Sequence, residues 1–258
     1  MDLVVAMILA FVQGVTEWFP ISSSGHLVLF EKLLNQSGGL VLEVTLHFGT
    51  LMAVFVYFGK DIMDILRDII SGKWKTQNAR LGFLLILSSI PAGIVGYFVK
   101  DIFDSLLSGI LLLGIGFGIN AMLLFIASAH HGKGKTIDNF SSLRVLMIGI
   151  AQALAIMPSI SRSGVTISSG VLLGLDEKSA LRFSFLMSIP VILGASLLTL
   201  ENTQLSLSFL PASLVSFAVG LATIHIAFVK ALNKRKNFVW FGLYCLLLSI
   251  GIIIFALL

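Results

Sequence analysis

The chain has 258 residues, of which 57% are hydrophobic and 12% are charged, against about 25% charged residues in an ordinary soluble domain. This composition excludes a soluble globular protein, a disordered chain and a coiled coil, and a mean hydropathy of +1.02 places most of the chain in a lipid bilayer. The formal charge of +4 comes without a soluble basic domain, which argues against a nucleic-acid partner, and the single Cys245 excludes an internal disulfide.

The first apolar segment, Leu3 to Phe30, lacks the basic region and cleavage site of a signal peptide, so we expect it to remain in the mature protein. It is interrupted by QGVTEWFPISSSGH. A proline among serines and glycines stops a helix at bilayer depth, and the freed backbone groups must face protein or a watery cavity. The segment therefore predicts a re-entrant helix hairpin. A second segment, Val145 to Leu175, is interrupted by AQALAIMPSISRSG and predicts another.

Other segments are apolar over the length of about 20 residues that a spanning helix needs. The predicted spans are Leu40 to Gly59, Leu81 to Val99, Gly109 to Ala129, Arg182 to Leu200, Phe209 to Val229 and Phe238 to Leu258. The fold class is thus an all-α polytopic membrane protein with six transmembrane helices and two re-entrant hairpins.

The order hairpin, three spans, hairpin, three spans makes the second hairpin enter from the opposite face, and the basic residues test this topology. One side would hold only Lys32 and Lys100. The other would hold fourteen: Lys60, Arg67, Lys73, Lys75, Arg80, Lys133, Lys135, Arg144, Lys178, Arg182, Lys230, Lys234, Arg235 and Lys236. We therefore expect a multi-pass cell-membrane protein with its basic side in the cytoplasm and both termini outside.

An internal repeat relates the two broken segments. Shifting the sequence by 139 residues aligns Gln13 with Gln152, Ile21 with Ile160, Ser22 with Ser161, Ser24 with Ser163, Gly25 with Gly164, Leu42 with Leu181 and Thr45 with Ser184. With an odd number of spans per unit, this predicts an inverted-topology repeat with a site near the membrane midplane. We expect one integral-membrane domain over 1–258, with repeat 1 at about 1–129, a cytoplasmic linker at about 130–142 and repeat 2 at about 143–258. One pair differs in kind: Ser23 falls on Arg162.

Three ionisable residues, Glu17, Glu43 and Arg162, lie inside apolar segments. Each costs roughly 3 kcal/mol at mid-bilayer by insertion scales unless it is paired or hydrated. One interpretation is a structural ion pair of Arg162 with Glu17 or Glu43. The other is a phosphate site, because a guanidinium fork, hydroxyls and helix N-termini all bind phosphate. The candidate phosphate-binding residues are Arg162, Ser161, Ser163, Gly164, Ser22, Ser24 and Gly25, with Ser23 beside them.

Gln13 and Glu17 share a helix face at a spacing of four residues, so their oxygens could hold a hard divalent cation. Glu43 and His47 form a similar pair on the next span. We expect His47 to contact the residues of the site rather than the ligand itself. His26 follows the SSSG turn and could act as general acid, general base or nucleophile, oriented by a nearby carboxylate. Ser23 is the alternative nucleophile, and the sequence leaves His26, Ser23 and water open; a helix-capping role for His26 is the structural alternative.

Through these residues the chain resembles the undecaprenyl-diphosphate phosphatase family, also called the bacitracin-resistance family. The resemblance covers essentially the whole chain and is carried by QGVTEWFPISSSGH (Gln13 to His26), PSISRSGVTISSG (Pro158 to Gly170) and LEVTLHFGTLMAV (Leu42 to Val54). Gln13 stands where many members have Glu, so this chain has a neutral side chain at that position of the motif.

The resemblance implies an integral-membrane hydrolase that removes the terminal phosphate of a polyprenyl diphosphate, recycling the lipid carrier for cell-wall synthesis. It also implies that the active site faces the outer side, in agreement with the topology expected from the charges. It implies a divalent cation such as Mg or Ca, with Glu17 and Gln13 in the metal and acidic motif, Ser23 and His26 in the catalytic turn and Arg162 on the diphosphate. The expected partners are this lipid substrate and membrane lipids, and a homodimer is left open.

Two rival functions follow from the same residues. Inverted repeats with broken helices also build secondary transporters, so the chain could move a polyprenyl phosphate or another anion across the membrane. The type-2 phosphatidate phosphatase family carries similar Ser-Gly-His and Ser-Arg fragments, but no Lys-x6-Arg-Pro motif precedes SSSGH and no His-x3-Asp follows Ser161-Arg162.

Overall fold

The protein is described by a computed structural model that covers residues 2–99, 109–130, 134–157 and 159–200 together with 207–258. Lys100 and Lys133, which enter the charge count above, and Pro158 of the second motif lie outside these described residues. The described chain is all-helical, with eleven α-helices and an isolated β-bridge between Lys135 and Leu175. Six of these helices are long and apolar enough to cross a membrane, which confirms the predicted fold class.

The six long helices lie close to the predicted spans. They are α3 (Gly39–Tyr57), α5 (Gln77–Val99), α7 (Ile110–Ala129), α10 (Glu177–Leu200), α11 (Leu210–Ile226) and α12 (Phe238–Leu257). Short 3₁₀ turns cover Ile137–Asn139, Leu154–Ile156, Leu207–Phe209 and Arg235–Asn237, and a π-helical segment, Ala227–Ala231, extends α11.

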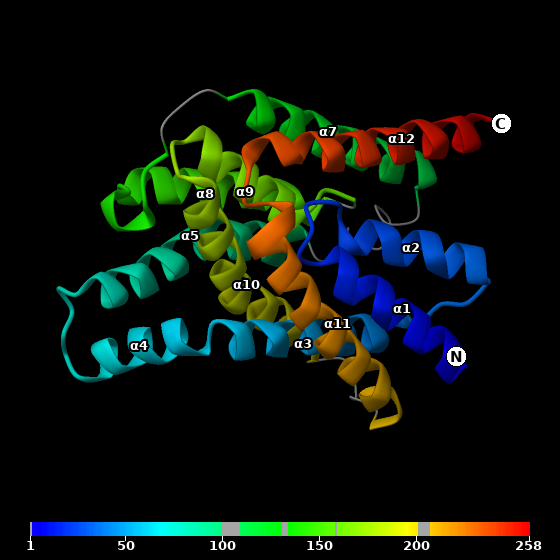
Figure 1. Cartoon of the computed structure of the whole chain (residues 1–258). Coiled ribbons are helices and arrows are strands. Elements are labelled where there is room, and N and C mark those ends of the chain that lie inside the picture. The colour runs from blue at the N-terminus through cyan, green and yellow to red at the C-terminus, as the bar shows by residue number, and fades with distance from the viewer. Residues whose placement is uncertain (1, 100–108, 131–133, 158, 201–206) are drawn as a thin grey trace.

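Each broken segment forms two short helices joined by a turn. The first hairpin consists of α1 (Leu3–Thr16) and α2 (Ser23–Leu34), and the second consists of α8 (Ser142–Ala153) and α9 (Arg162–Leu172). The first hairpin lies toward the end of the molecule that carries both termini, whereas the second lies toward the opposite end, and their turns meet in the middle (Figure 1). This arrangement is the one expected for two re-entrant segments of opposite orientation.

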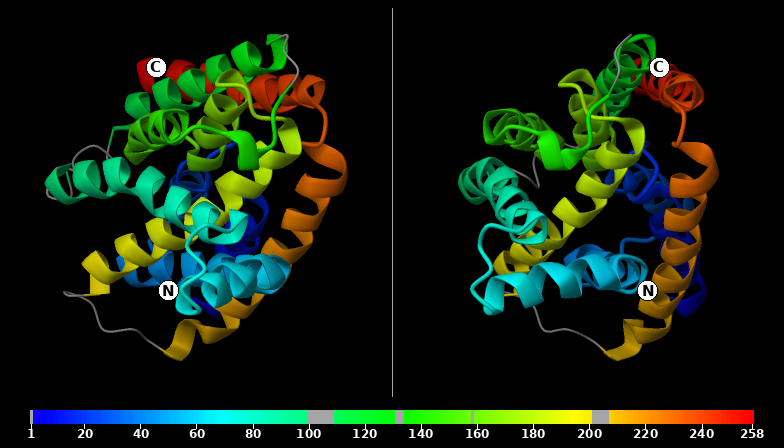
Figure 2. Two further views of the ribbon diagram at one scale, coloured as in Figure 1. Left: turned by 90° about the vertical axis from the view of Figure 1, so that its left-hand side faces the viewer. Right: turned by 60° about the vertical axis from the view of Figure 1, so that its left-hand side comes forward.

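The two halves of the chain are interlocked by their spans. In the first half α1 and α3 pack on α11, and in the second half the corresponding α8 and α10 pack on α5. Each hairpin therefore rests on a span from the other half, and α7 and α12 lie side by side along one flank (Figures 1 and 2). The symmetry of these contacts supports the repeat, while its exact boundaries stay a prediction.

One helix was not expected from the sequence. Helix α4 (Gly59–Ile70) follows α3 almost directly. It carries both charged and apolar residues, so a search for long apolar stretches does not find it. Asp61 on α4 accepts two hydrogen bonds from the Arg182 guanidinium on α10, at 2.9 and 3.1 Å. An ion pair thus connects the two halves at the end opposite the termini.

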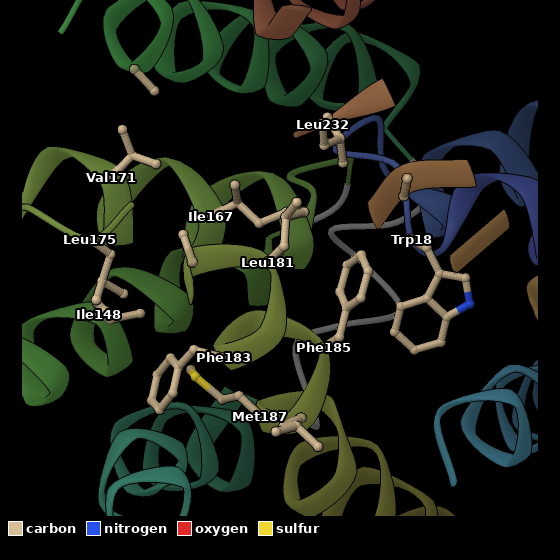
Figure 3. Packing of buried hydrophobic residues seen from close by; sticks show 14 of the residues in the cluster. Trp18, Ile148, Ile167, Val171, Leu175, Leu181, Phe183, Phe185, Met187 and Leu232 are labelled. Atoms are coloured by element: carbon tan, nitrogen blue, oxygen red, sulfur yellow. The ribbon is translucent and has the colours of Figure 1, made fainter. Parts of the chain in front are cut away.

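The hydrophobic core surrounds the meeting point of the hairpins. Trp18, from the first turn, packs edge-to-face against Phe185 of α10 with 5.1 Å between ring centroids. Ile167 of α9 and Leu181 of α10 continue this core on the other side (Figure 3). The polar turns therefore lie between fully buried apolar side chains. In such surroundings a charged side chain is costly unless it is paired.

Candidate active site

The first turn is fixed by Ser22, the N-cap residue of α2. Its hydroxyl accepts a hydrogen bond from the Gly25 backbone N–H at 3.2 Å and lies 3.3 Å from the Ser24 hydroxyl. Ser22 has a φ of 68°, which is unfavourable for a residue with a side chain. Such a conformation costs about 1–3 kcal/mol and persists only where its surroundings impose it. Ser23 is consequently presented at the first position of α2.

The second turn repeats these capping hydrogen bonds, although its cap residue Ser161 has an ordinary extended backbone with a φ of −72°. The Ser161 hydroxyl caps α9 by accepting from the Gly164 backbone N–H at 3.0 Å, and it lies 3.1 Å from the Ser163 hydroxyl. Arg162 occupies the first position of α9, as Ser23 does in α2. The N-termini of two helices therefore carry the candidate functional side chains.

The two turns are bonded directly to each other. The Ser163 hydroxyl donates to the backbone oxygen of Phe19 at 3.0 Å and lies 3.4 Å from that of Glu17. A Cβ atom at Gly25 would lie 2.7 Å from the Phe117 ring, and one at Gly164 would lie 2.5 Å from the amide oxygen of Asn120. Glycine is therefore required at both positions, because a larger residue would clash with Phe117 or Asn120.

Four side chains converge on the carboxylate of Glu17, which is 7% exposed. Arg162 Nη2 lies 2.7 Å from Oε1. Around Oε2, the Ser23 hydroxyl donates at 2.5 Å, the Gln13 amide donates at 3.1 Å, and His47 Nε2 lies 3.6 Å away. The predicted shared face of Gln13 and Glu17 is confirmed by their hydrogen bond.

Arg162 is held from three directions. Besides Glu17, its Nη1 donates to the backbone oxygen of Ser184 at 3.2 Å, and its guanidinium carbon lies 5.6 Å from the Trp18 ring centroid. The ion pair that the sequence offered as a structural alternative is therefore formed. It lies inside the hydroxyl cluster expected for a phosphate site, so the two interpretations describe one place.

His26 has other partners than the expected carboxylate. Its Nδ1 lies 2.6 Å from the backbone oxygen of Ser22, and its Nε2 lies 2.7 Å from the hydroxyl of Tyr244 on α12. Within the described residues these bonds occupy both ring nitrogens, and none joins His26 to Glu17. Tyr244 was missed by sequence reasoning because it stands in an apolar span, 218 residues from its partner.

Glu43 lies apart from the Glu17 cluster. It lines a small pocket between α1, α2 and α3 together with Ser24, Glu31 and apolar side chains. His47 is bonded through Nδ1 to the backbone oxygen of Glu43 at 2.9 Å, which directs its Nε2 toward Glu17. His47 thus reaches the cluster, and the contribution of Glu43 is its backbone oxygen.

The oxygen ligands available for a cation are few. Within the described chain no three His, Cys, Asp or Glu side chains gather as a metal site. The Gln13 amide oxygen, however, is buried without a hydrogen-bond partner, next to the carboxylate that its own amide nitrogen contacts. Magnesium is commonly held by one or two protein oxygens together with substrate phosphates and water. Gln13 and Glu17 fit that pattern, in which the substrate completes the coordination.

Comparison with known proteins identifies the family of this site. Residues 6–251 match the model of the family described as Bacitracin resistance protein BacA, which includes both hairpins and nearly all of the spans. The chain belongs to this family. The match confirms the resemblance that the two turn motifs indicated.

Full-length relatives support the same assignment. A protein of Methanosphaera stadtmanae named Undecaprenyl-diphosphatase is 36% identical over 99% of both chains. Proteins of the same name from Thermosipho melanesiensis and Desulforudis audaxviator are each 38% identical, over 95% and 98% of this chain and 96% and 97% of their own. The relatives include archaeal and bacterial organisms.

Proposed function

We propose that this family member is an undecaprenyl-diphosphatase, a multi-pass membrane enzyme that releases the terminal phosphate of undecaprenyl diphosphate. The observation that carries this function is a half-buried serine hydroxyl bonded to a buried carboxylate that is itself paired with an arginine. Ser23, Glu17 and Arg162 supply in one place a nucleophile, a proton acceptor and a phosphate-binding fork.

Ser23 is the nucleophile that the geometry favours among those the sequence left open. Its hydroxyl already donates to Glu17 at 2.5 Å, whereas both nitrogens of His26 are bonded elsewhere. Ser23 Oγ attacks the terminal phosphorus and gives its proton to Glu17. The bond from phosphorus to the bridging oxygen breaks, and the lipid monophosphate leaves. Water then attacks the phosphorus of the phosphoserine, the bond from phosphorus to Ser23 Oγ breaks, and the inorganic phosphate keeps the water's oxygen and protons. Ser23 recovers its proton from Glu17.

Charge neutralisation supplies much of the remaining catalysis. Arg162 exchanges part of its contact with Glu17 for the phosphate oxygens. The first residues of α2 and α9, Ser23 and Arg162, both contact Glu17, so the N-termini of the two helices lie beside the same carboxylate. A divalent cation held by Gln13 and Glu17 would offset further negative charge on the diphosphate. The leaving monophosphate is a weak base, with a second pKa near 6 for phosphate monoesters, so it needs little protonation at neutral pH.

The same proposal includes an orientation in the membrane. The end with both termini faces outward and the opposite end faces the cytoplasm, because the opposite end holds the lysine-bearing connection between α4 and α5 (Figure 1). The site then opens toward the outer side, and the prenyl tail lies along apolar helix faces. Single cysteines placed in the α4–α5 loop and at the C-terminus, in a variant lacking Cys245, test this by labelling with an impermeant reagent from one side.

Phosphate release by purified protein in detergent tests the function. Wild-type protein should release phosphate from undecaprenyl diphosphate, while folded Glu17→Gln and Arg162→Gln variants should lose at least about 100-fold in kcat/KM. A transporter would release nothing in the absence of a membrane. Near-normal turnover by either variant would contradict the assigned site without contradicting the reaction.

Removal of divalent cations tests the cofactor separately. Dialysis against a chelator should abolish phosphate release, and added Mg²⁺ or Ca²⁺ should restore it. Gln13→Glu adds a carboxylate to the proposed ligands and should lower the cation concentration needed for half-maximal rate. An unchanged requirement in Gln13→Glu would remove Gln13 from the cation site.

A further inference from the structure

The hydrogen bond between Tyr244 and His26 connects two distant parts of the chain. Tyr244 lies on α12 and is 42% exposed, while His26 lies on the first hairpin and is 4% exposed. Their rings are nearly parallel, with an interplanar angle of 6° and 5.7 Å between centroids, and Phe117 meets the imidazole edge-to-face from another side at 5.4 Å. The imidazole is therefore fixed by two rings and two hydrogen bonds.

These hydrogen bonds determine which ring nitrogen carries the proton. The backbone oxygen of Ser22 can only accept, so Nδ1 of His26 is the donor in that contact. In the neutral ring Nε2 is then an acceptor, and the Tyr244 hydroxyl must donate to it. The pair thus holds one tautomer of His26 in one orientation, with Tyr244 as its outermost member.

The backbone of Ser22 connects this hydrogen-bonded pair to Ser23, the proposed nucleophile. Ser22, whose oxygen accepts from His26, has the positive φ of 68° described above and directly precedes Ser23. The Ser23 hydroxyl donates to Glu17 at 2.5 Å. A series of short contacts therefore runs from Tyr244 through His26 and the strained Ser22 to the attacking oxygen.

We propose that Tyr244 is a positioning residue of the active site, which holds Ser23 in its attacking orientation through His26 and the Ser22 backbone. The proposal rests on the function proposed above. Attack on phosphorus needs the oxygen in line with the leaving group, and small displacements at such sites cost large factors in rate. Helix α12 also meets the first turn through Phe241 on the Phe19 ring and Cys245 beside the Pro20 backbone oxygen, and Tyr244 adds the hydrogen bond that reaches His26.

The test compares Tyr244→Phe, which removes the hydroxyl and keeps the ring, with Tyr244→Leu, which removes both. Tyr244→Phe should lower kcat about tenfold or more and change KM less than twofold, since orientation rather than binding is lost. Tyr57→Phe is the matched control, because Tyr57 is also in a span and near a histidine but has only ring contacts among the described residues. A normal kcat in Tyr244→Phe with a defect only in Tyr244→Leu would mean that the ring merely packs, and would overturn the proposal.

A spectroscopic readout separates this proposal from the proposed function. In protein labelled with ¹⁵N-histidine, the resonance that disappears in His26→Gln identifies His26, and its Nε2 shift should move in Tyr244→Phe but not in Tyr57→Phe. In a double-mutant cycle, Tyr244→Phe should have little further effect on kcat once His26 is Gln. Independent effects, or an unmoved Nε2 shift, would overturn the positioning role. Loss of the reaction from the wild-type protein would instead overturn the function.

Discussion

The two hairpins have nearly the same local structure and different chemistry. In each, a serine caps the second helix by accepting from the N–H three residues later, Gly25 in one and Gly164 in the other. At the next position the first hairpin has Ser23 and the second has Arg162. Glu17 and His26 of the first hairpin align with Ile156 and Val165 of the second.

This difference indicates how two similar hairpins contribute to one proposed active site. In the proposed mechanism the first hairpin carries the nucleophile Ser23 together with Glu17 and His26, and the second carries the Arg162 guanidinium that pairs with Glu17. Because the two turns are bonded through the Ser163 hydroxyl and the Glu17–Arg162 ion pair, neither hairpin is complete alone. The two hairpins share the helix N-termini, and the residues in which they differ carry the proposed chemistry.

Removing the nucleophile should give the largest effect. Ser23→Ala should lower kcat by at least about 1000-fold, as expected when an attacking group is lost, with thermal unfolding little changed. Rapid quenching of wild-type protein with ³²P-labelled substrate should trap phosphate on Ser23. Ser89→Ala is a suitable control, because among the described residues this serine bonds only within its own helix, to the Leu85 backbone oxygen at 2.7 Å. Phosphate trapped on His26 would reverse the assignment of roles.

Changing the cation of the second hairpin should give an intermediate effect. Arg162→Lys keeps the charge near Glu17 but loses the planar fork that also reaches the backbone oxygen of Ser184. We expect kcat/KM to fall by about 100-fold while the protein remains folded. Arg162→Ala should also be unstable by about 3 kcal/mol, since it leaves the Glu17 carboxylate buried without its partner. Equal activity of the Arg and Lys proteins would mean that only the charge matters.

Much of this architecture was predictable because the bilayer restricts the sequence. About 20 apolar residues are needed to cross it, so the spans are visible in the composition, and Pro20 among serines marks the first turn. The neighbourhood of Glu17 and Arg162 was predictable because buried charges require partners. Tyr244 was not, since a tyrosine in an apolar span gives no local signal of its partner. The expectation that a carboxylate orients His26 was wrong, because α12 supplies that partner.

The smallest expected effect concerns the glutamines that the repeat aligns. Gln13 bonds to Glu17, whereas both polar atoms of the Gln152 side chain are buried without a partner among the described residues. Replacing an unsatisfied buried polar group by an apolar one of similar size is neutral or stabilising. Gln152→Leu should therefore raise the free energy of unfolding by about 1 kcal/mol and leave phosphate release unchanged. Gln13→Leu should lower activity, because it removes a donor to Glu17 and a candidate cation ligand. If the two variants behave alike, the second hairpin contributes to the chemistry through more than Arg162.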